Sequence, residues 1–373
     1  MKYTSYTYHC VRAEVSAFII EDGVTEYHIM LHVTNPMLSY YEQMEAVFKI
    51  YTSLLQNELH GASSIFKRFF LSDAANQTDL LLARMIEDSD CALSVVQQPP
   101  LDGTKIALWA HLLTNVKTNM LPNGLFEVKC GKYRQLWLGG CSNKAANSEY
   151  QMRLLLNDYV MQLMEENCTL EANCLRTWIF VQNVDCNYAG AVKARNEVFA
   201  TQNLTEKTHY IASTGIEGRH ADPKVLVMLD AYAIEGIKPD QIKYLYARTH
   251  LNPTYEYGVS FERGTAVDFE DRRQIIISGT ASINNHGEIV FPGDVVRQAE
   301  RMCENVEALL KEADSCFEEL QYIIVYLRDT ADYLVIKSFF EKSFPNIPTI
   351  ITLASVCRPG WLVEMECMAV KAL

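Results

Sequence analysis

The sequence contains no run of about 18 uncharged apolar residues, the length needed to span a bilayer. Its first residues, Met1 to Tyr6, lack the apolar core of a signal peptide. Only 17 Gly and 11 Pro occur among 373 residues, and charged residues make up 21%. These values exclude a membrane-spanning, collagen-like or mainly disordered chain. We therefore expect a globular cytoplasmic protein of two or three domains.

Basic residues are too few to form a nucleic-acid surface. The chain has 33 Lys and Arg against 46 Asp and Glu, a formal net charge of −13. Nucleic-acid binding needs a basic face, so this class of partner is excluded. A small anionic metabolite remains compatible with the charge, provided that local arginines overcome the negative field.

Disulfide, metal and phosphate patterns are also missing. The 11 cysteines are odd in number and none are spaced as Cys-x-x-Cys, which indicates reduced thiols in a chain without a signal peptide. The nine histidines show no metal-ligand spacing. Residues 215–219 are too weak a match to count as a Gly-rich phosphate loop. We expect neither a metal nor an organic cofactor.

What the sequence does contain is one pattern that occurs three times. Each copy predicts a strand, a long helix, a strand, a second helix and two closing strands. A glutamine early in the long helix is followed 30 to 32 residues later by Asp or Asn. These pairs are Gln43 and Asp73, Gln151 and Asn183, and Gln298 and Asp329. Any α/β chain shows similar patterns by chance, but the near-constant spacing favours a true repeat.

The repeat divides the chain into unit 1 (residues 1–120), unit 2 (121–237) and unit 3 (272–373). Residues 238–271 fit no repeat and form an aromatic linker, of the kind that often carries function. Helices of about 20 residues would cover one face of each sheet, giving α+β units. Three such units can close a pseudo-threefold ring, the single-chain counterpart of a cyclic trimer. We expect a monomer or a weak oligomer, with unit 1 mainly structural.

Unit 3 carries several short motifs. They are Ser278-Gly279, Gly293-Asp294, Gln298, Glu304-Asn305, residues 325–329, Pro348 and residues 362–366. In these motifs unit 3 resembles the Rid (YjgF) superfamily, which implies a chorismate-mutase-like α+β fold and a trimer with a site at each subunit interface. The imine-deaminating members carry an arginine just after the proline of the penultimate strand. Here Thr349 follows Pro348, so that arginine is missing.

A second set of motifs runs through the last two-thirds of the chain. It comprises residues 175–178, 194–199, 212–216, 257–258, 261–264 and, most specifically, 277–283 with His286. In these the chain resembles the chorismatase family, whose members remove pyruvate from chorismate and whose fold resembles a Rid trimer. Three features depart from that family. Val259-Ser260 replaces a longer insert, Glu262 stands in place of a serine, and the middle helix has lost much of the family's arginine and tyrosine.

Glu364 is the candidate catalytic residue. It aligns with Leu108 and Met228 of the first two units, and strand alternation predicts that all three lie on the same face. The apolar residues indicate a partly buried position, where a carboxyl has a raised pKa and can act as a general acid. Cleavage of an enolpyruvyl ether needs a proton at its methylene carbon. The alternative is a glutamate paired with an arginine.

The remaining candidates are substrate-binding residues. Arg263 matches the family arginine, and its planar fork suits a carboxylate. The resemblance implies that Cys357, Ala281 and Gly279 shape the pocket. Further candidates are Tyr255 and Tyr257 as hydrogen-bond donors and Arg219 facing a carboxylate; core packing or a solvated loop is the alternative for these.

The leading hypothesis is a chorismatase-like lyase or hydrolase that releases pyruvate and leaves a hydroxybenzoate or a dihydrodiol-type acid. Two alternatives stay open. One is a non-catalytic Rid-fold protein that binds a small metabolite. The other is a Rid-type imine hydrolase with an altered carboxylate anchor.

Overall fold

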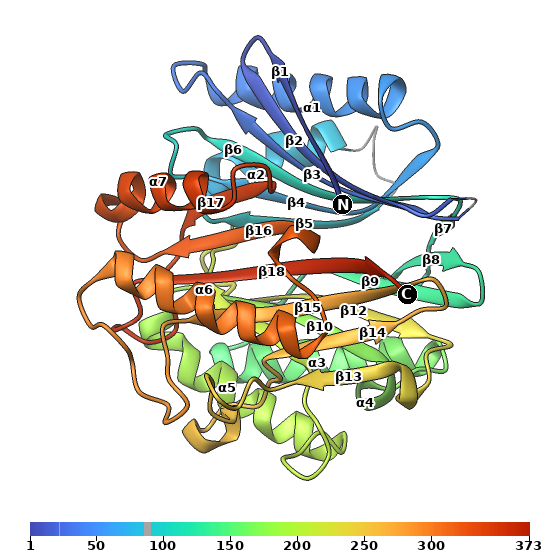
Figure 1. Ribbon diagram of the computed structural model, residues 1–373, viewed down its shortest axis with the longest axis vertical. Helices are drawn as coiled ribbons and strands as arrows, with labels where there is room; N and C mark the ends of the chain where they lie inside the picture. Colours follow the sequence, from blue (N-terminus) through green and yellow to red (C-terminus); the bar gives the residue numbers. More distant parts are fainter. Residues whose placement is uncertain (22, 86–90) are drawn as a thin grey trace.

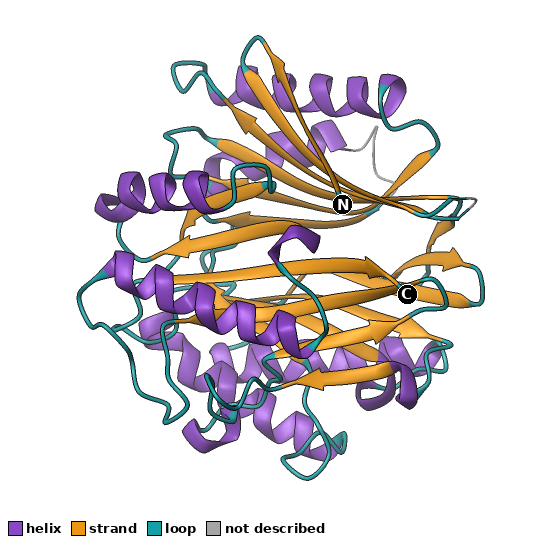
Figure 2. Ribbon diagram, in the orientation of Figure 1, coloured by secondary structure: helices purple, strands orange, loops and turns teal. Residues whose placement is uncertain are grey.

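Three six-stranded sheets of the same topology make up the protein (Figure 1). The computed structural model describes residues 1–21, 23–85 and 91–373. In each sheet the first two strands in chain order form one edge, and the other four strands lie beside them. Figure 2 shows the long helices on the outer faces of the sheets. Among the described residues, no helix is long and apolar enough to cross a membrane.

The first sheet has the order β1-β2-β3-β6-β4-β5. Its elements are β1 (Lys2–Tyr8), β2 (Val11–Ile19), β3 (Thr25–Val33), α1 (Tyr40–Asn57), β4 (Ala62–Leu71), α2 (Ala74–Met85), β5 (Ala92–Gln97) and β6 (Ile106–Thr114).

The second sheet has the order β11-β10-β12-β9-β8-β7. Its elements are β7 (Lys117–Met120), β8 (Phe126–Cys130), β9 (Tyr133–Ser142), α3 (Ser148–Glu165), α4 (Leu170–Asn173), β10 (Cys174–Val181), α5 (Val184–Thr201), β11 (Ala212–Glu217) and β12 (Val227–Glu235).

The third sheet has the order β13-β14-β15-β18-β16-β17. Its elements are β13 (Ile242–Leu245), β14 (Gly264–Asp268), β15 (Arg272–Ala281), α6 (Val295–Glu312), β16 (Leu320–Leu327), α7 (Tyr333–Ser343), β17 (Thr349–Leu353) and β18 (Val363–Ala372). The stretch 238–271, which fits no repeat in the sequence, therefore supplies two strands of this sheet. Short 3₁₀ turns lie at Pro239–Gln241, Thr254–Tyr257, Phe317–Glu319 and Thr330–Asp332.

The three repeated glutamines hold equivalent positions in the fold. Gln43 Oε1 accepts a hydrogen bond from the Lys105 backbone N–H, just before β6. Gln151 and Gln298 accept in the same way from Leu226 and Leu362, just before β12 and β18. All three side chains are fully buried. Each therefore ties the start of the long helix to the last strand of its unit, which explains the constant spacing.

The helix-free faces of the sheets meet in one shared core. Trp109 of β6 lies 4.5 Å from Tyr322 of β16 and 6.1 Å from Trp178 of β10, measured between ring centroids. One aspect of the predicted alignment is wrong. Leu108 packs in the separate core beneath α1, whereas Met228 faces the shared core. The residue of β6 equivalent to Glu364 is Ala107, because Ala107 pairs with His32 as Glu364 pairs with Ala281.

A buried ionic network crosses the centre of the shared core. Arg68 Nη2 lies 2.8 Å from Asp230 Oδ2, and its Nη1 lies 3.8 Å from Glu366 Oε1. Arg176 Nη2 lies 2.8 Å from the other oxygen of Glu366. All four side chains are essentially inaccessible to solvent. Because Arg68 belongs to the first sheet, Asp230 to the second and Glu366 to the third, this network fixes the three units together.

Candidate functional site

A narrow cavity of about 40 Å³ lies between the second and third sheets. Its walls come from α5 and β11 on one side, β15 and β18 on the other, and two loops. The lining residues are Tyr188, Arg195, Ser213, Gly215, Tyr257, Val259, Phe261, Arg263, Gly279, Ala281, Ile283, Cys357, Arg358, Trp361 and Glu364. Six of the eight site residues predicted from the sequence are among them.

Glu364 is the carboxyl group of this cavity. It lies on β18 opposite Ala281 of β15, and it is 5% exposed. A Cβ at Gly279 would overlap with Glu364 Oε1, so a side chain at this position would displace the carboxyl group from its present place. Among the described residues, no protein group donates a hydrogen bond to this carboxyl. It is therefore a buried acid with its oxygens free for a ligand.

The surroundings of Glu364 favour its neutral form. Burial first, and then the nearby carboxylate of Glu366, raise the pKa of Glu364 to about 8. Arg176 and Arg263 lower the pKa of Glu364, but they do not offset this rise fully. Arg176 binds Glu366 directly, and Trp178 Nε1 donates a second hydrogen bond of 2.7 Å to Glu366. At neutral pH Glu364 is therefore mostly a carboxylic acid that can give up a proton.

Arg195 supplies an uncompensated positive charge to the same cavity. It projects from α5, is 2% exposed, and its Nε and Nη2 atoms are buried without a hydrogen-bond partner. A buried guanidinium with unmet donors is costly unless a ligand accepts from it. In the sequence, Arg195 belongs to a motif that resembles a chorismatase helix segment, and it was not among the predicted site residues. The arginine of that motif was the signal that could have identified it.

Arg263 is held in place by the loop before β14. Its Nη2 donates to the Asn252 carbonyl at 3.0 Å and to Asn252 Oδ1 at 3.1 Å. The guanidinium lies 5.4 Å from the ring centroids of both Tyr257 and Phe261. These contacts fix one edge of the guanidinium, while the residue itself lines the cavity. Arg263 is thus a second cation beside Glu364.

Tyr257 and Arg358 form one side of the cavity. The Arg358 guanidinium lies 4.6 Å from the ring centroid of Tyr257 and 5.2 Å from that of Trp361. Cys357 lies next to them. Burial, with a smaller contribution from Glu364, raises the pKa of the Cys357 thiol to about 12. The thiol is therefore protonated at neutral pH, and it shapes the pocket without acting as a nucleophile.

Two predicted candidates lie elsewhere. Tyr255 is 42% exposed and lines a neighbouring pocket with Glu262 and Arg263. Arg219 has a half-exposed side chain that lies 3.7 Å from Glu217, and it does not line the cavity. Tyr255 therefore lies next to the site, because Arg263 lines both pockets. Arg219 lies outside the site.

Glu26, His28 and His111 form the one group of potential metal ligands found among the described residues. They lie in the shared core, away from the cavity. Trp109 Nε1 donates to His28 Nδ1 at 3.1 Å, which assigns the proton of a neutral His28 to Nε2, the atom 3.4 Å from Glu26. A metal would need that nitrogen unprotonated. The three residues fit a hydrogen-bonded core network better than a metal site.

The last third of the chain is similar in sequence to known proteins. Residues 265–371 match the family described as Endoribonuclease L-PSP. A RutC family protein of Pyrococcus abyssi is 31% identical over 99 residues, which cover 26% of this chain and 78% of that protein. The 3-aminoacrylate deaminase RutC of Acinetobacter baylyi is 25% identical over 97 residues, covering 26% and 77%.

The likeness extends over most of the chain in one solved structure. A crystal structure of a chorismatase superposes with a TM-score of 0.64 at 16% sequence identity, and the match covers 82% of this chain and 93% of that one. At this level of identity the likeness shows the fold. The predicted architecture of three tandem α+β units is thereby confirmed.

Proposed function

Because this chain belongs to the RutC family through its last third, we propose that the cavity between the second and third sheets is the working site, and that the protein is a chorismatase-like enzyme. The observation that carries this proposal is the pairing of a neutral carboxylic acid, Glu364, with the unpartnered guanidinium of Arg195 in one buried cavity. A proton donor and an anion anchor are what the cleavage of an anionic enolpyruvyl ether requires.

The proposed reaction starts with proton transfer from Glu364 to the methylene carbon of the enolpyruvyl group. Water adds to the resulting oxocarbenium ion, and the hemiketal collapses to pyruvate and a ring that keeps the ether oxygen as a hydroxyl group. This ring product is the dihydrodiol-type acid, and the loss of one water molecule from it gives the hydroxybenzoate. Glu364 recovers its proton at the end of either route.

Arg195 and Arg263 are the proposed carboxylate anchors. Chorismate carries two carboxylates. Arg195 can offer its Nε and Nη2 as a planar pair of donors, whereas Arg263, whose Nε and Nη2 bind Asn252, can offer its Nη1. A dianion in the cavity also raises the cost of ionising Glu364, so binding favours the acid form. A ring needs more room than the cavity provides. Displacement of Arg358 from its stack on Tyr257 would open the side of the cavity that these two residues form.

Removing the Arg195 charge should weaken substrate binding more than turnover. We expect Arg195→Met to raise KM for chorismate about 10- to 100-fold, because one charge-assisted interaction is lost. Steady-state kinetics on the purified variants would measure this. Arg219→Met is the matched comparison, with an expected KM within about twofold of the parent. An equal rise of KM in both variants would mean that Arg195 is not the carboxylate anchor.

The pH dependence of turnover should follow the acid form of Glu364. Since its folded-state pKa is about 8, kcat/KM should be nearly constant from pH 6 to 7 and fall tenfold per pH unit well above 8. Because bound dianion raises the cost of ionising Glu364, the decrease of kcat should occur at a higher pH than the decrease of kcat/KM. A rate that rises through pH 8 would mean that Glu364 acts as a base.

A Rid-type imine hydrolase is the second candidate, supported by the deaminase among the relatives. Its penultimate-strand arginine is replaced by Thr349 in unit 3, and Arg195 would have to serve as the anchor. Pyruvate release from chorismate, followed in a coupled spectrophotometric assay, separates the two enzymes from each other. Ammonia release from 2-aminoacrylate without action on chorismate would favour the hydrolase. Thermal stabilisation by chorismate without turnover would favour a binding protein.

A further inference from the structure

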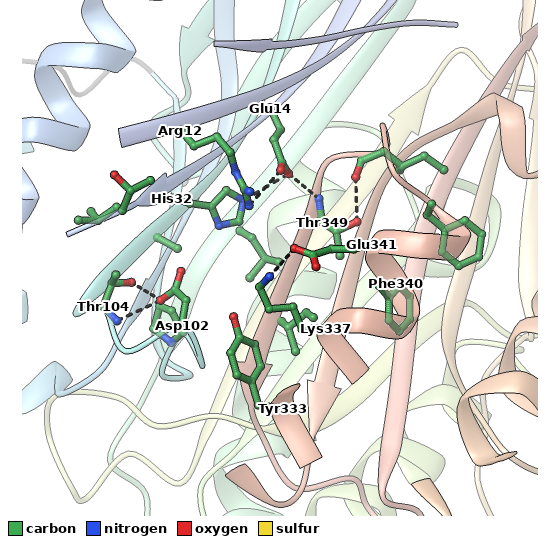
Figure 3. A pocket seen from close by; sticks show the side chains of 18 of the residues that line it. Arg12, Glu14, His32, Asp102, Thr104, Tyr333, Lys337, Phe340, Glu341 and Thr349 are labelled. Atoms are coloured by element: carbon green, nitrogen blue, oxygen red, sulfur yellow. Dashed lines mark hydrogen bonds and ion pairs between the residues drawn. The ribbon is translucent and has the colours of Figure 1, made fainter. Parts of the chain in front are cut away.

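The repeat creates a second cavity at the equivalent interface between the third and first sheets. It measures about 340 Å³, within the size range of small-molecule sites. Figure 3 shows its side chains arriving from both units: Arg12, Glu14 and His32 from β2 and β3, and Tyr333 and Lys337 from α7. This cavity is independent of the one that contains Glu364.

The chemistry of this second cavity differs from that of the first. Ala107 takes the place of Glu364, and His32 takes the place of Ala281, as the paired registers of β3–β6 and β15–β18 show. The cavity therefore contains no counterpart of the general acid. It is suited to binding without the proton transfer proposed for the first site.

The charged groups of the cavity include a slight excess of carboxylates. Two permanent cations, Arg12 and Lys337, face Glu14, Asp102 and Glu341. Arg12 pairs with Glu14 at 3.1 Å, and Lys337 pairs with Glu341. Burial opposes ionisation of Glu14, but His32 and Arg12 outweigh it and lower the Glu14 pKa. Such a lining disfavours a dianion like chorismate and favours a ligand that carries its own positive charge.

Asp102 has a carboxylate oxygen that can still accept a hydrogen bond from a ligand. Its Oδ1 accepts from the backbone N–H of Thr104 at 3.0 Å and from the Thr104 hydroxyl at 2.6 Å. Among the described residues, no protein group donates to its other oxygen. Arg12 pairs with Glu14 through Nη2, and its side chain is 43% exposed and lines the cavity, so part of the guanidinium remains accessible to a ligand. The cavity thus offers one acceptor for a cation and one donor for an anion.

Apolar side chains complete the wall. Phe340 and Phe344 of the α7 segment, with Ile347 and Ile350 near β17, are all nearly or fully buried and line the cavity. They leave a surface against which a hydrocarbon group of a ligand can pack. A ligand with both charges and no hydrocarbon part would leave this wall without a partner.

We propose that this second cavity binds an apolar α-amino acid in its zwitterionic form. The ammonium group is bound by Asp102, the carboxylate by Arg12 with Lys337 nearby, and the side chain packs against Phe340 and Ile350. The second cavity is a binding site and not a second centre of turnover, and it is independent of the function of the Glu364 cavity.

Calorimetric titration of the full-length protein with three probes of equal hydrocarbon size tests the charge requirement. L-Phenylalanine should bind, phenethylamine should bind roughly tenfold more weakly, and 3-phenylpropionate should bind at least about 100-fold more weakly, because it lacks the group that Asp102 recognises. Binding of 3-phenylpropionate as tight as that of L-phenylalanine would overturn the proposal. So would failure of L-phenylalanine to bind at about 10 mM.

Two variants place the ligand in the structure. Asp102→Asn keeps an acceptor for Thr104 but loses the charge, so it should weaken L-phenylalanine binding at least about tenfold. Glu364→Gln changes only the other cavity and should leave that affinity within about twofold. Unchanged binding in Asp102→Asn contradicts the proposal. Loss of binding in Glu364→Gln would assign the amino acid to the first cavity and also overturn it.

Discussion

Replacing Glu364 by Gln should lower kcat for pyruvate release about 100- to 10,000-fold, the range expected for loss of a positioned general acid. Glutamine has nearly the same shape and fits beside Gly279, but its amide cannot supply the proton. Chorismate binding should persist, because Arg195 and Arg263 are unchanged. Single-turnover assays with separate measurement of binding would distinguish these effects. Full activity in the variant would eliminate Glu364 as the acid.

Stability measurements show whether that loss is catalytic or merely structural. The folded-state pKa of Glu364 is about 8, against an ordinary value of 4.5, so the folded protein holds this proton more tightly than the unfolded chain. The stability that this contributes is complete below about pH 4.5 and is lost as the pH rises to 8. Gln removes this dependence. The stability of the variant relative to the parent should therefore increase by roughly 2–5 kcal/mol as the pH rises from 5 to 9.

Replacing Arg68 by Met should destabilise the fold by about 3–5 kcal/mol, the usual result of removing one partner from a buried ionic network. Methionine can pack among the surrounding rings of Phe66, Trp109 and Trp178. Among the residues that the structure describes, the change nevertheless leaves the Gly140 backbone N–H, at 2.6 Å, as the one hydrogen-bond donor to the Asp230 carboxylate. Urea denaturation monitored by tryptophan fluorescence would measure the loss.

A second substitution and a surface control test this interpretation. Arg68→Met combined with Asp230→Asn should be more stable than Arg68→Met alone, because the unpaired charge is gone. Arg153→Met removes a surface arginine that pairs with Glu149 and Glu197, and it should cost no more than about 1 kcal/mol. Equal losses for Arg68→Met and Arg153→Met would mean that the central network does not hold the units together.

Local patterns were enough to predict the units and most of one site. Gln43, Gln151 and Gln298 revealed the repeat because each must bridge a helix and a strand at a fixed separation along the chain. Glu364, Gly279 and Ala281 were selected because short motifs on two adjacent strands resemble those of the chorismatase family. Motifs of this kind are readable in sequence because neighbouring side chains on paired strands constrain each other directly.

Strand register was harder to predict. The alignment of Leu108 with Glu364 was one residue off, and one residue is enough to turn a side chain to the opposite face. Leu108 and Ala107 are both apolar, and both faces of β6 are buried. The alternation of polar and apolar residues that would have fixed the register is therefore absent from this strand.

Three repeated α+β units and a candidate acid on the last strand could be predicted from the sequence, because both depend on contacts within one unit. The contacts between units could not be predicted, because they form only in the folded protein. Arg195 became a buried, unpartnered cation because α5 of one unit faces β18 of the next. The Arg68 network and the cavity around Asp102 arise in the same way. Such groups lie far apart along the chain, and only closure of the ring brings them together.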